Sequence, residues 1–136
     1  MTSAFAIRKT IATSLALGVL GSGLVLAPDA LAQGGGGGVR AAGSCSARGI
    51  WTLKVKPDHG RLEVEAEVDV NRVGTHFRWV LTQNGRTVRT GTATTQAPSG
   101  SFSINRSLVN HVGTDRIGFR ATNSAGTNTC HGALSS

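Results

Sequence analysis

The clearest pattern in the chain is a strict alternation of apolar and acidic residues over positions 62–70. Five apolar side chains alternate there with four carboxylates: Leu62, Val64, Ala66, Val68 and Val70 with Glu63, Glu65, Glu67 and Asp69. A helix cannot hold five residues at i+2 spacing on one side, whereas the pleat of a strand does so. The pattern therefore predicts a strand with one buried face and one acidic, solvent-facing side.

The preceding residues, 50–56, show the same alternation, with Trp51, Leu53 and Val55 on one side. Positions 57–60 have the composition of a turn, so we expect the two segments to form a hairpin. A four-residue loop would pair Lys56 with Arg61, Lys54 with Glu63, and Trp51 with Ala66. Most of these pairs are favourable, because they join opposite charges or set a large ring against a small side chain.

A second hairpin is predicted over residues 76–94, centred on Asn84-Gly85. Both residues tolerate the positive φ that a type I′ turn requires, which makes this dipeptide a strong hairpin signal. Counting outward from the turn gives the expected pairs Gln83–Arg86, Leu81–Val88, Trp79–Thr90 and Phe77–Thr92. One face of the hairpin is then apolar, and the other carries His76, Arg78, Val80 and Arg89.

Shorter alternating segments follow at 101–105, 116–121 and 127–131. No helical periodicity appears beyond the N-terminal leader. Seven short strands separated by turns predict an all-β sandwich, with an up-and-down barrel as the alternative.

Residues 1–32 have the features of a signal peptide, which we expect to form a single N-terminal signal helix. Arg8-Lys9 is a short basic region, residues 11–26 carry no charge, and Ala30-Leu31-Ala32 has the small–x–small pattern of a cleavage site. We place cleavage between Ala32 and Gln33. The uncharged run is short for a membrane anchor, which is the alternative. The sequence thus predicts a secreted or envelope-associated protein with no membrane span in its mature form.

The rest of the chain is predicted to be one domain with short flanking segments. Residues 33–44 contain five consecutive glycines and are expected to be a flexible linker, 45–133 the β-domain, and 134–136 a tail. Cys45 and Cys130 are the only cysteines and bracket nearly all of the patterned sequence. In an oxidising compartment we expect them to form one disulfide.

Two segments resemble immunoglobulin-like and fibronectin type III domains. Phe77-Arg78-Trp79 followed by Asn84-Gly85 resembles strand C and the C–C′ turn of the first family, and residues 121–126 its F–G corner. Gly113-Thr114-Asp115 is similar to the E–F region of the second. The chain has no tyrosine, so the tyrosine corner is absent, and the two family cysteine positions hold Phe119 and, approximately, Ala66. The chain is also similar to small secreted bacterial proteins with a Gly-rich leader, this hairpin and two terminal cysteines.

The resemblance implies a seven-stranded, Greek-key, immunoglobulin-like sandwich, in which strands A, B and E form one sheet and strands C′, C, F and G the other. The resemblance implies that the second sheet carries an outward basic group: Arg78, Arg89, Arg116, Arg120 and His76. The 14 Lys and Arg against 7 Asp and Glu give a net charge of +7, which attracts polyanions. Our hypothesis is a monomeric, non-enzymatic binding or adhesion module for an anionic envelope component or acidic protein. Nucleic acid is possible but not favoured. The simpler interpretation is that these charges only keep the domain soluble.

The alternative function is that of a structural exported domain, or a protease-inhibitor-like protein acting through the loop 96–100. No nucleophile elbow, zinc-protease motif or paired catalytic carboxylates are present. The four histidines, His59, His76, His111 and His131, lack ligand spacing. We therefore predict no catalytic residue, no metal site and no cofactor.

Overall fold

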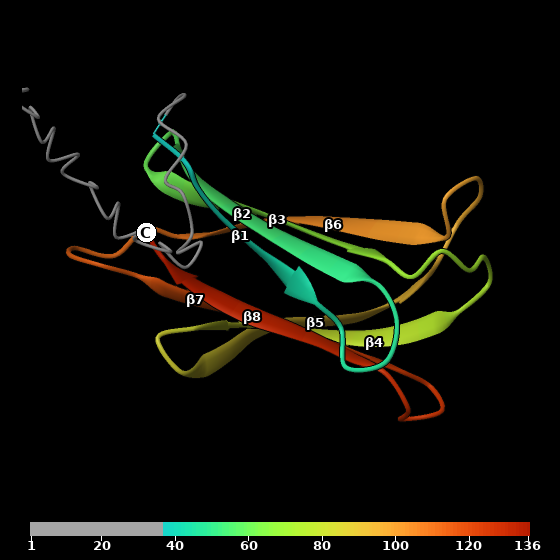
Figure 1. The fold of residues 1–136 in the computed structure, drawn as a ribbon. Helices are drawn as coiled ribbons and strands as arrows, with labels where there is room; N and C mark the ends of the chain where they lie inside the picture. The colour runs from blue at the N-terminus through green and yellow to red at the C-terminus, as the bar shows by residue number, and fades with distance from the viewer. Residues whose placement is uncertain (1–36) are drawn as a thin grey trace, which may run out of the picture.

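The computed structural model describes residues 37–136, and every regular element among them is a β-strand. Two four-stranded antiparallel sheets pack face to face, with strand orders β1-β2-β3-β6 and β5-β4-β7-β8 (Figure 1). The strands are β1 (Val39–Ser44), β2 (Ile50–Asp58), β3 (Arg61–Asp69), β4 (His76–Gln83), β5 (Arg86–Thr94), β6 (Ser101–Val109), β7 (Arg116–Asn123) and β8 (Thr129–Ser135). The all-β prediction with two sheets is confirmed.

The expected count of seven strands is wrong, because residues 37–136 already form eight. The additional strand is β1, which pairs with β2 from Val39↔Val55 to Ser44↔Ile50. It lies within the segment predicted to be a flexible linker, so that prediction fails for its second half. Val39 and Ala41 pack against the core, and Gly43 leaves room for the ring of Trp51. The signal peptide, its cleavage site and residues 33–36 lie outside the described residues.

The core lies between the two sheets and is built from alternate residues of each strand. In β3, the side chains of Leu62, Val64, Ala66 and Val68 are buried, as the alternation predicts. The second sheet contributes large side chains from β4 and β7: Phe77, Trp79, Leu81, Ile117 and Phe119. Inward and outward positions on β2, β3, β4 and β7 therefore agree with the sequence pattern.

The β2–β3 hairpin has a tighter turn than the four-residue loop that we expected. His59 and Gly60 form a two-residue turn with φ of 47° and 75°, the positive values of a type I′ turn. The observed pairs, Lys56↔Glu63 and Lys54↔Glu65, are shifted by two residues from the expected ones. Because side chains alternate with period two, this shift keeps every residue on its predicted face.

The β4–β5 hairpin confirms the turn but not the pairing beyond it. Asn84 and Gly85 have φ of 52° and 82°, and Gln83 pairs with Arg86. A bulge then shifts the register, so that Leu81 pairs with Arg89 and Trp79 with Gly91. A one-residue shift exchanges the two faces of β5. The physical reason is the indole of Trp79, since a Cβ on Gly91 would lie 2.5 Å from Cζ2 of that ring.

A disulfide joins Cys45 to Cys130, as predicted. It connects the loop after β1 to β8 and so ties one sheet to the other. The expected tail, 134–136, is instead part of the fold, because Leu134 is buried in β8 and Ser136 exchanges two backbone hydrogen bonds with Asp115.

Candidate functional site

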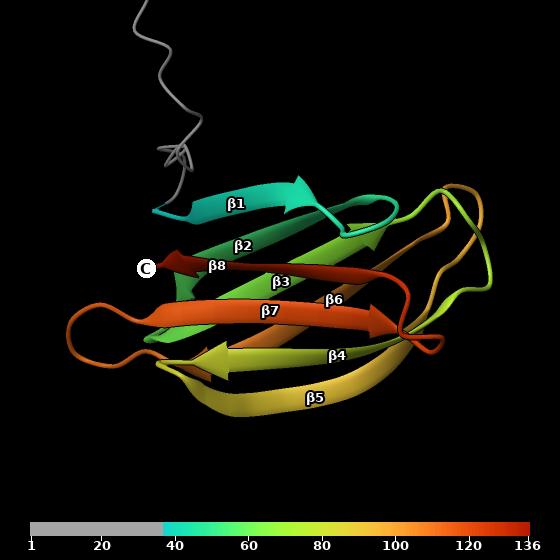
Figure 2. The same cartoon turned by 60° about the horizontal axis from the view of Figure 1, so that its bottom comes forward.

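The outer surface of the second sheet carries most of the residues predicted to bind. In β4 and β7, side chains alternate between the core and solvent, so Arg78 and Arg120 point outward. Arg78 lies opposite Thr122 and Arg120 opposite Val80. The two arginines are therefore diagonal neighbours on adjacent central strands (Figure 2), with Cα atoms about 7 Å apart.

Three further basic residues share this surface, two of them predicted. His76 lies two residues before Arg78 on β4, and its Nδ1 is 2.8 Å from Oγ1 of Thr94. Arg116 is farther away, at the start of β7 opposite Ser135, about 13 Å along the strand from Arg120. His131, which was not predicted to bind, lies directly opposite Arg120. We call His76, Arg78, Arg116, Arg120 and His131 the basic face.

The sequence could have placed His131 on the outer side of its strand, because a disulfide-bonded Cys130 is expected to be buried. In a strand, the neighbour of a buried residue points outward. What the sequence lacked was a reason to place the last strand beside the one containing Arg120. His76 and His131 lie in the same sheet, but β7 separates their strands.

Arg89 does not belong to the basic face, which corrects the prediction. After the bulge it lies opposite Leu81, whose side chain is fully buried. Its guanidinium bonds instead to the Val88 carbonyl at 2.7 Å and to the Ser107 carbonyl of the other sheet at 3.5 Å.

The basic face includes a depression at the start of β4. It is lined by His76, Arg78, Thr92, Thr94, Thr122, Ser124 and their neighbours. Arg78 has threonine hydroxyls on both adjacent strands, because it pairs with Thr92 and with Thr122. A guanidinium beside neutral hydroxyls offers hydrogen-bond donors to an anionic group.

The two outer faces of the sandwich differ in charge. None of the strands β4, β5, β7 and β8 contains Asp or Glu, whereas β3 alone carries four. Both lysines of the first sheet are paired, Lys54 with Glu65 at 3.6 Å and Lys56 with Glu63 at 3.2 Å. By contrast, no arginine within residues 37–136 forms an ion pair. Arg78 and Arg120 therefore lie close together without a neutralising partner.

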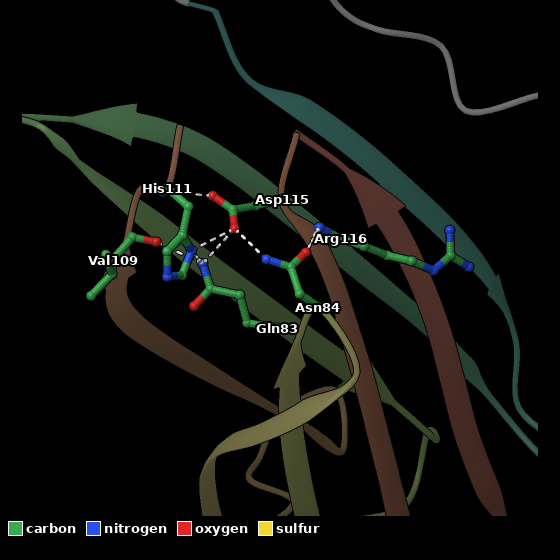
Figure 3. Close-up of polar contacts among 6 residues, drawn as sticks. All are labelled: Gln83, Asn84, Val109, His111, Asp115 and Arg116. Carbon is green, nitrogen blue, oxygen red and sulfur yellow. Dashed lines mark hydrogen bonds and ion pairs between the residues drawn. The ribbon is translucent and has the colours of Figure 1, made fainter. Parts of the chain in front are cut away.

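A second polar centre surrounds Asp115, which is 1% exposed (Figure 3). Its carboxylate accepts hydrogen bonds from the backbone N–H of His111 at 2.9 Å and from Asn84 Nδ2 at 2.8 Å. Gln83 Nε2 also donates to it at 3.1 Å, and Nδ1 of His111 lies 2.8 Å away. Burial alone would raise the pKa of Asp115, but the bonds from His111, Asn84 and Gln83 outweigh it and lower the pKa to about 2.

The Asp115 centre has a structural role. A buried carboxylate that orients a histidine is one part of a general-base arrangement, and the ring of His111 is half-exposed. A nucleophile is also needed, and no hydroxyl or thiol of the described chain is hydrogen-bonded to His111. The centre joins the β4–β5 turn to the β6–β7 loop through the bond from Asn84 to Asp115. It also joins β4 to β6, because Gln83 donates to the Val109 carbonyl at 2.6 Å.

Comparisons of the chain with protein-family models, with curated proteins and with solved structures found no match. Residues 37–136 include no helix that could cross a membrane. In the same part of the chain, no three His, Cys, Asp or Glu side chains are grouped to hold a metal ion.

Proposed function

We propose that this protein is a secreted, non-enzymatic binding module that attaches through its basic face to an anionic polymer of the cell envelope. An acidic protein is the alternative partner of the same face. The observation that carries the proposal is the charge distribution: five basic side chains share a surface whose four strands contain no carboxylate. The disulfide is compatible with an oxidising, extracellular location.

The neighbouring arginines support an anionic ligand in particular. Like charges on adjacent strands repel each other, so an anion bridging Arg78 and Arg120 would relieve that repulsion. A polymer with repeated anionic groups could contact this pair and the more distant Arg116 together. Exposed pairs of this kind are weakened by salt, with a screening length of about 8 Å at physiological ionic strength.

The test is retention of the exported chain on immobilised polyphosphate, with charge reversal at the centre of the face. Arg78→Glu/Arg120→Glu is expected to abolish retention at physiological salt, since it places two carboxylates where the ligand binds. The matched control is Arg40→Glu/Arg48→Glu, which makes the same change in net charge at exposed positions outside the face. Unchanged retention of the first variant, or equal loss in both, would contradict the proposal.

We also propose that the sandwich has an immunoglobulin-like, Greek-key topology. In its support, strands β2, β3 and β6 share the first sheet, as A, B and E do in fibronectin type III domains. The order β5-β4-β7-β8 likewise corresponds to C′, C, F and G. An experimental structure with a different strand order would overturn this assignment.

The second candidate is a structural domain or an inhibitor of a secreted protease that acts through loop 96–100. Residues 96–99 are exposed, while Gly100 donates to the Gln96 carbonyl at 2.8 Å and so closes the loop. A preformed loop loses less conformational freedom on binding. Protease binding that survives high salt and is lost when the loop is replaced would favour this candidate over the basic face.

A further inference from the structure

At the open margin between β5 and β6, two arginines occupy strand positions that face the core. β6 is the outermost strand of the first sheet, and Arg106 lies opposite Val64, whose side chain is fully buried. Arg89 holds the corresponding position on β5, opposite Leu81. Both long side chains leave the sandwich through this margin and end in solvent. The guanidinium of Arg106 lies over the ring of Trp79, 5.0 Å from its centroid.

Three guanidiniums meet at the backbone of β6 in this margin. Arg61 reaches over from β3 and donates to the Ser107 hydroxyl at 2.7 Å and to the Ser107 carbonyl at 3.3 Å. Arg89 donates to the same carbonyl from the opposite sheet at 3.5 Å. Arg106 donates to the carbonyl of Asn105, its preceding neighbour on the strand, at 2.7 Å. We call Arg61, Arg89 and Arg106 the arginine cluster.

The arginine cluster has no carboxylate partner in the described part of the chain. The nearest acidic residues by register are Glu63, opposite Ser107, and Asp58, opposite Arg61. Glu63 is already bound by Asn105 and Lys56, and Asp58 lies against the ring of His59. The guanidiniums therefore hydrogen-bond only to neutral oxygens, and like charges gathered without an anion repel each other.

Donors remain free for a ligand. Among residues 37–136, no partner is found for Nη1 of Arg61, for Nε of Arg89, or for Nε and Nη2 of Arg106. A guanidinium donates hydrogen bonds in a planar fork that matches the oxygens of phosphate and carboxylate groups. The free donors are thus single nitrogens on Arg61 and Arg89 and the Nε/Nη2 fork of Arg106. Because they come from two different sheets rather than from one plane, they suit an anion with four tetrahedrally arranged oxygens better than a planar carboxylate.

We propose that the arginine cluster binds a tetrahedral oxyanion, a phosphate or sulfate group, at the β5/β6 margin. The site is separate from the basic face, because Arg61 and Arg106 belong to the other sheet and Arg89 lies on the inward side of β5. The guanidiniums also cover carbonyl groups of an edge strand, which opposes pairing of β6 with another chain.

The experiment follows the arginine side-chain Nε–Hε signals of the full exported chain by NMR. Sodium phosphate, sodium sulfate and sodium acetate are titrated separately at constant ionic strength. We expect saturable shifts of the Arg61, Arg89 and Arg106 signals with phosphate and with sulfate, and none with acetate. Sulfate only accepts hydrogen bonds and the guanidiniums only donate them, so the two tetrahedral anions should bind comparably. A linear response, or an equal response to acetate, would overturn the proposal.

Two double variants locate the site. In Arg61→Gln/Arg89→Gln, the Arg106 signal should respond at least tenfold more weakly, whereas Arg78→Gln/Arg120→Gln should respond like the parent chain. The reverse pattern would assign the anion to the basic face and overturn this site. Because Arg61 lies on an exposed outer surface, the single Arg61→Gln variant remains as a folded test if the double variant loses its amide dispersion. A response equal to that of the parent chain would then contradict the site.

Discussion

The sandwich has two open margins, β1/β8 and β5/β6, where the edges of the two sheets face each other. Different groups cover the core at each margin. At the β1/β8 margin, the ring of Trp51 lies over Gly43 and Gly132, and the Cys45–Cys130 disulfide joins the sheets. At the β5/β6 margin, the ring of Trp79 lies over Gly91, and the arginine cluster bonds across the opening. Both margins therefore set a tryptophan over a glycine of an edge strand, an arrangement that shields the bare backbone.

The difference lies in what finishes each margin. A covalent bond completes the first, and both cysteines are buried. The exposed arginine cluster covers the β5/β6 margin, and its hydrogen bonds can exchange with water or a ligand. The disulfide margin therefore suits stability, and the arginine margin is the one at which binding can be expected.

The largest expected effect comes from breaking the covalent margin. Cys45→Ala/Cys130→Ala should lose about 2–5 kcal/mol of unfolding free energy, because the bond closes an 85-residue separation and restricts the unfolded chain. Urea unfolding of both proteins gives this difference. Reduction should destabilise the parent chain to a similar extent and leave the variant unchanged. Equal stability of the oxidised parent and the variant would show that the bond does not hold this margin closed.

A second test concerns Asp115, which stands outside both margins and links the sheets through Gln83. Because its pKa in the folded state is about 2, below the ordinary value of 3.8, its carboxylate stabilises the fold above pH 4. That contribution, of the order of 2 kcal/mol, should be lost as the pH falls from about 4 to 2.

The control for this acid test is Asp115→Asn. The pKa of Glu63 is also lowered, by its bonds to Asn105 and Lys56, so the parent chain alone would show a composite loss. The stability difference between parent and variant isolates Asp115 and should shrink over that pH range. A difference that is constant with pH would contradict the assigned role.

The glycines allow the two margins to be compared directly. Gly132→Ala and Gly91→Ala each push a methyl group into a tryptophan ring, and overpacking of this kind costs about 1–3 kcal/mol. We expect Gly132→Ala to cost more, because Trp51 is also confined by Gly43 and the nearby disulfide. Thermal unfolding measures both. The double variant Trp51→Leu/Gly132→Ala should lose less stability than the sum of the losses in the two single variants. If the two losses simply add, the cost of Gly132→Ala does not come from its contact with Trp51.

Much of this architecture follows from the sequence, and the two errors in strand pairing have a common physical origin. Alternation placed the core residues correctly, even where the β2–β3 pairing was wrong by two positions, because a two-residue shift preserves the faces. In β5 the shift is one residue, and there Arg89 changed sides. Arg86 to Thr94 contain almost no apolar residue that could reveal which face is buried. The signal that could have helped is Gly91, the small residue that Trp79 requires opposite it.

The strand β1 and the arginine cluster were not foreseeable for a different reason. Val39 and Ala41 are too small to mark a strand beside a glycine run, and β1 is ordered by the backbone of β2. The cluster combines residues from β3, β5 and β6 that share no pattern along the chain. The central part of the basic face was predictable, because alternation within β4 and β7 points Arg78 and Arg120 outward and the fibronectin-like resemblance places these two strands in one sheet.

The smallest expected effect tests whether the arginine margin stabilises the fold at all. Arg106→Gln removes the cation above Trp79 while keeping a polar side chain, and an exposed contact of this kind is worth about 0.5–1 kcal/mol. Arg116→Gln is the matched control, since that exposed arginine has no side-chain hydrogen bond within residues 37–136. If urea unfolding shows the two variants to be equally stable, the contact between Arg106 and Trp79 adds nothing measurable to the stability of this margin. The charge of Arg106 would then serve only what lies outside the fold: a bound anion, or an approaching strand to be kept away.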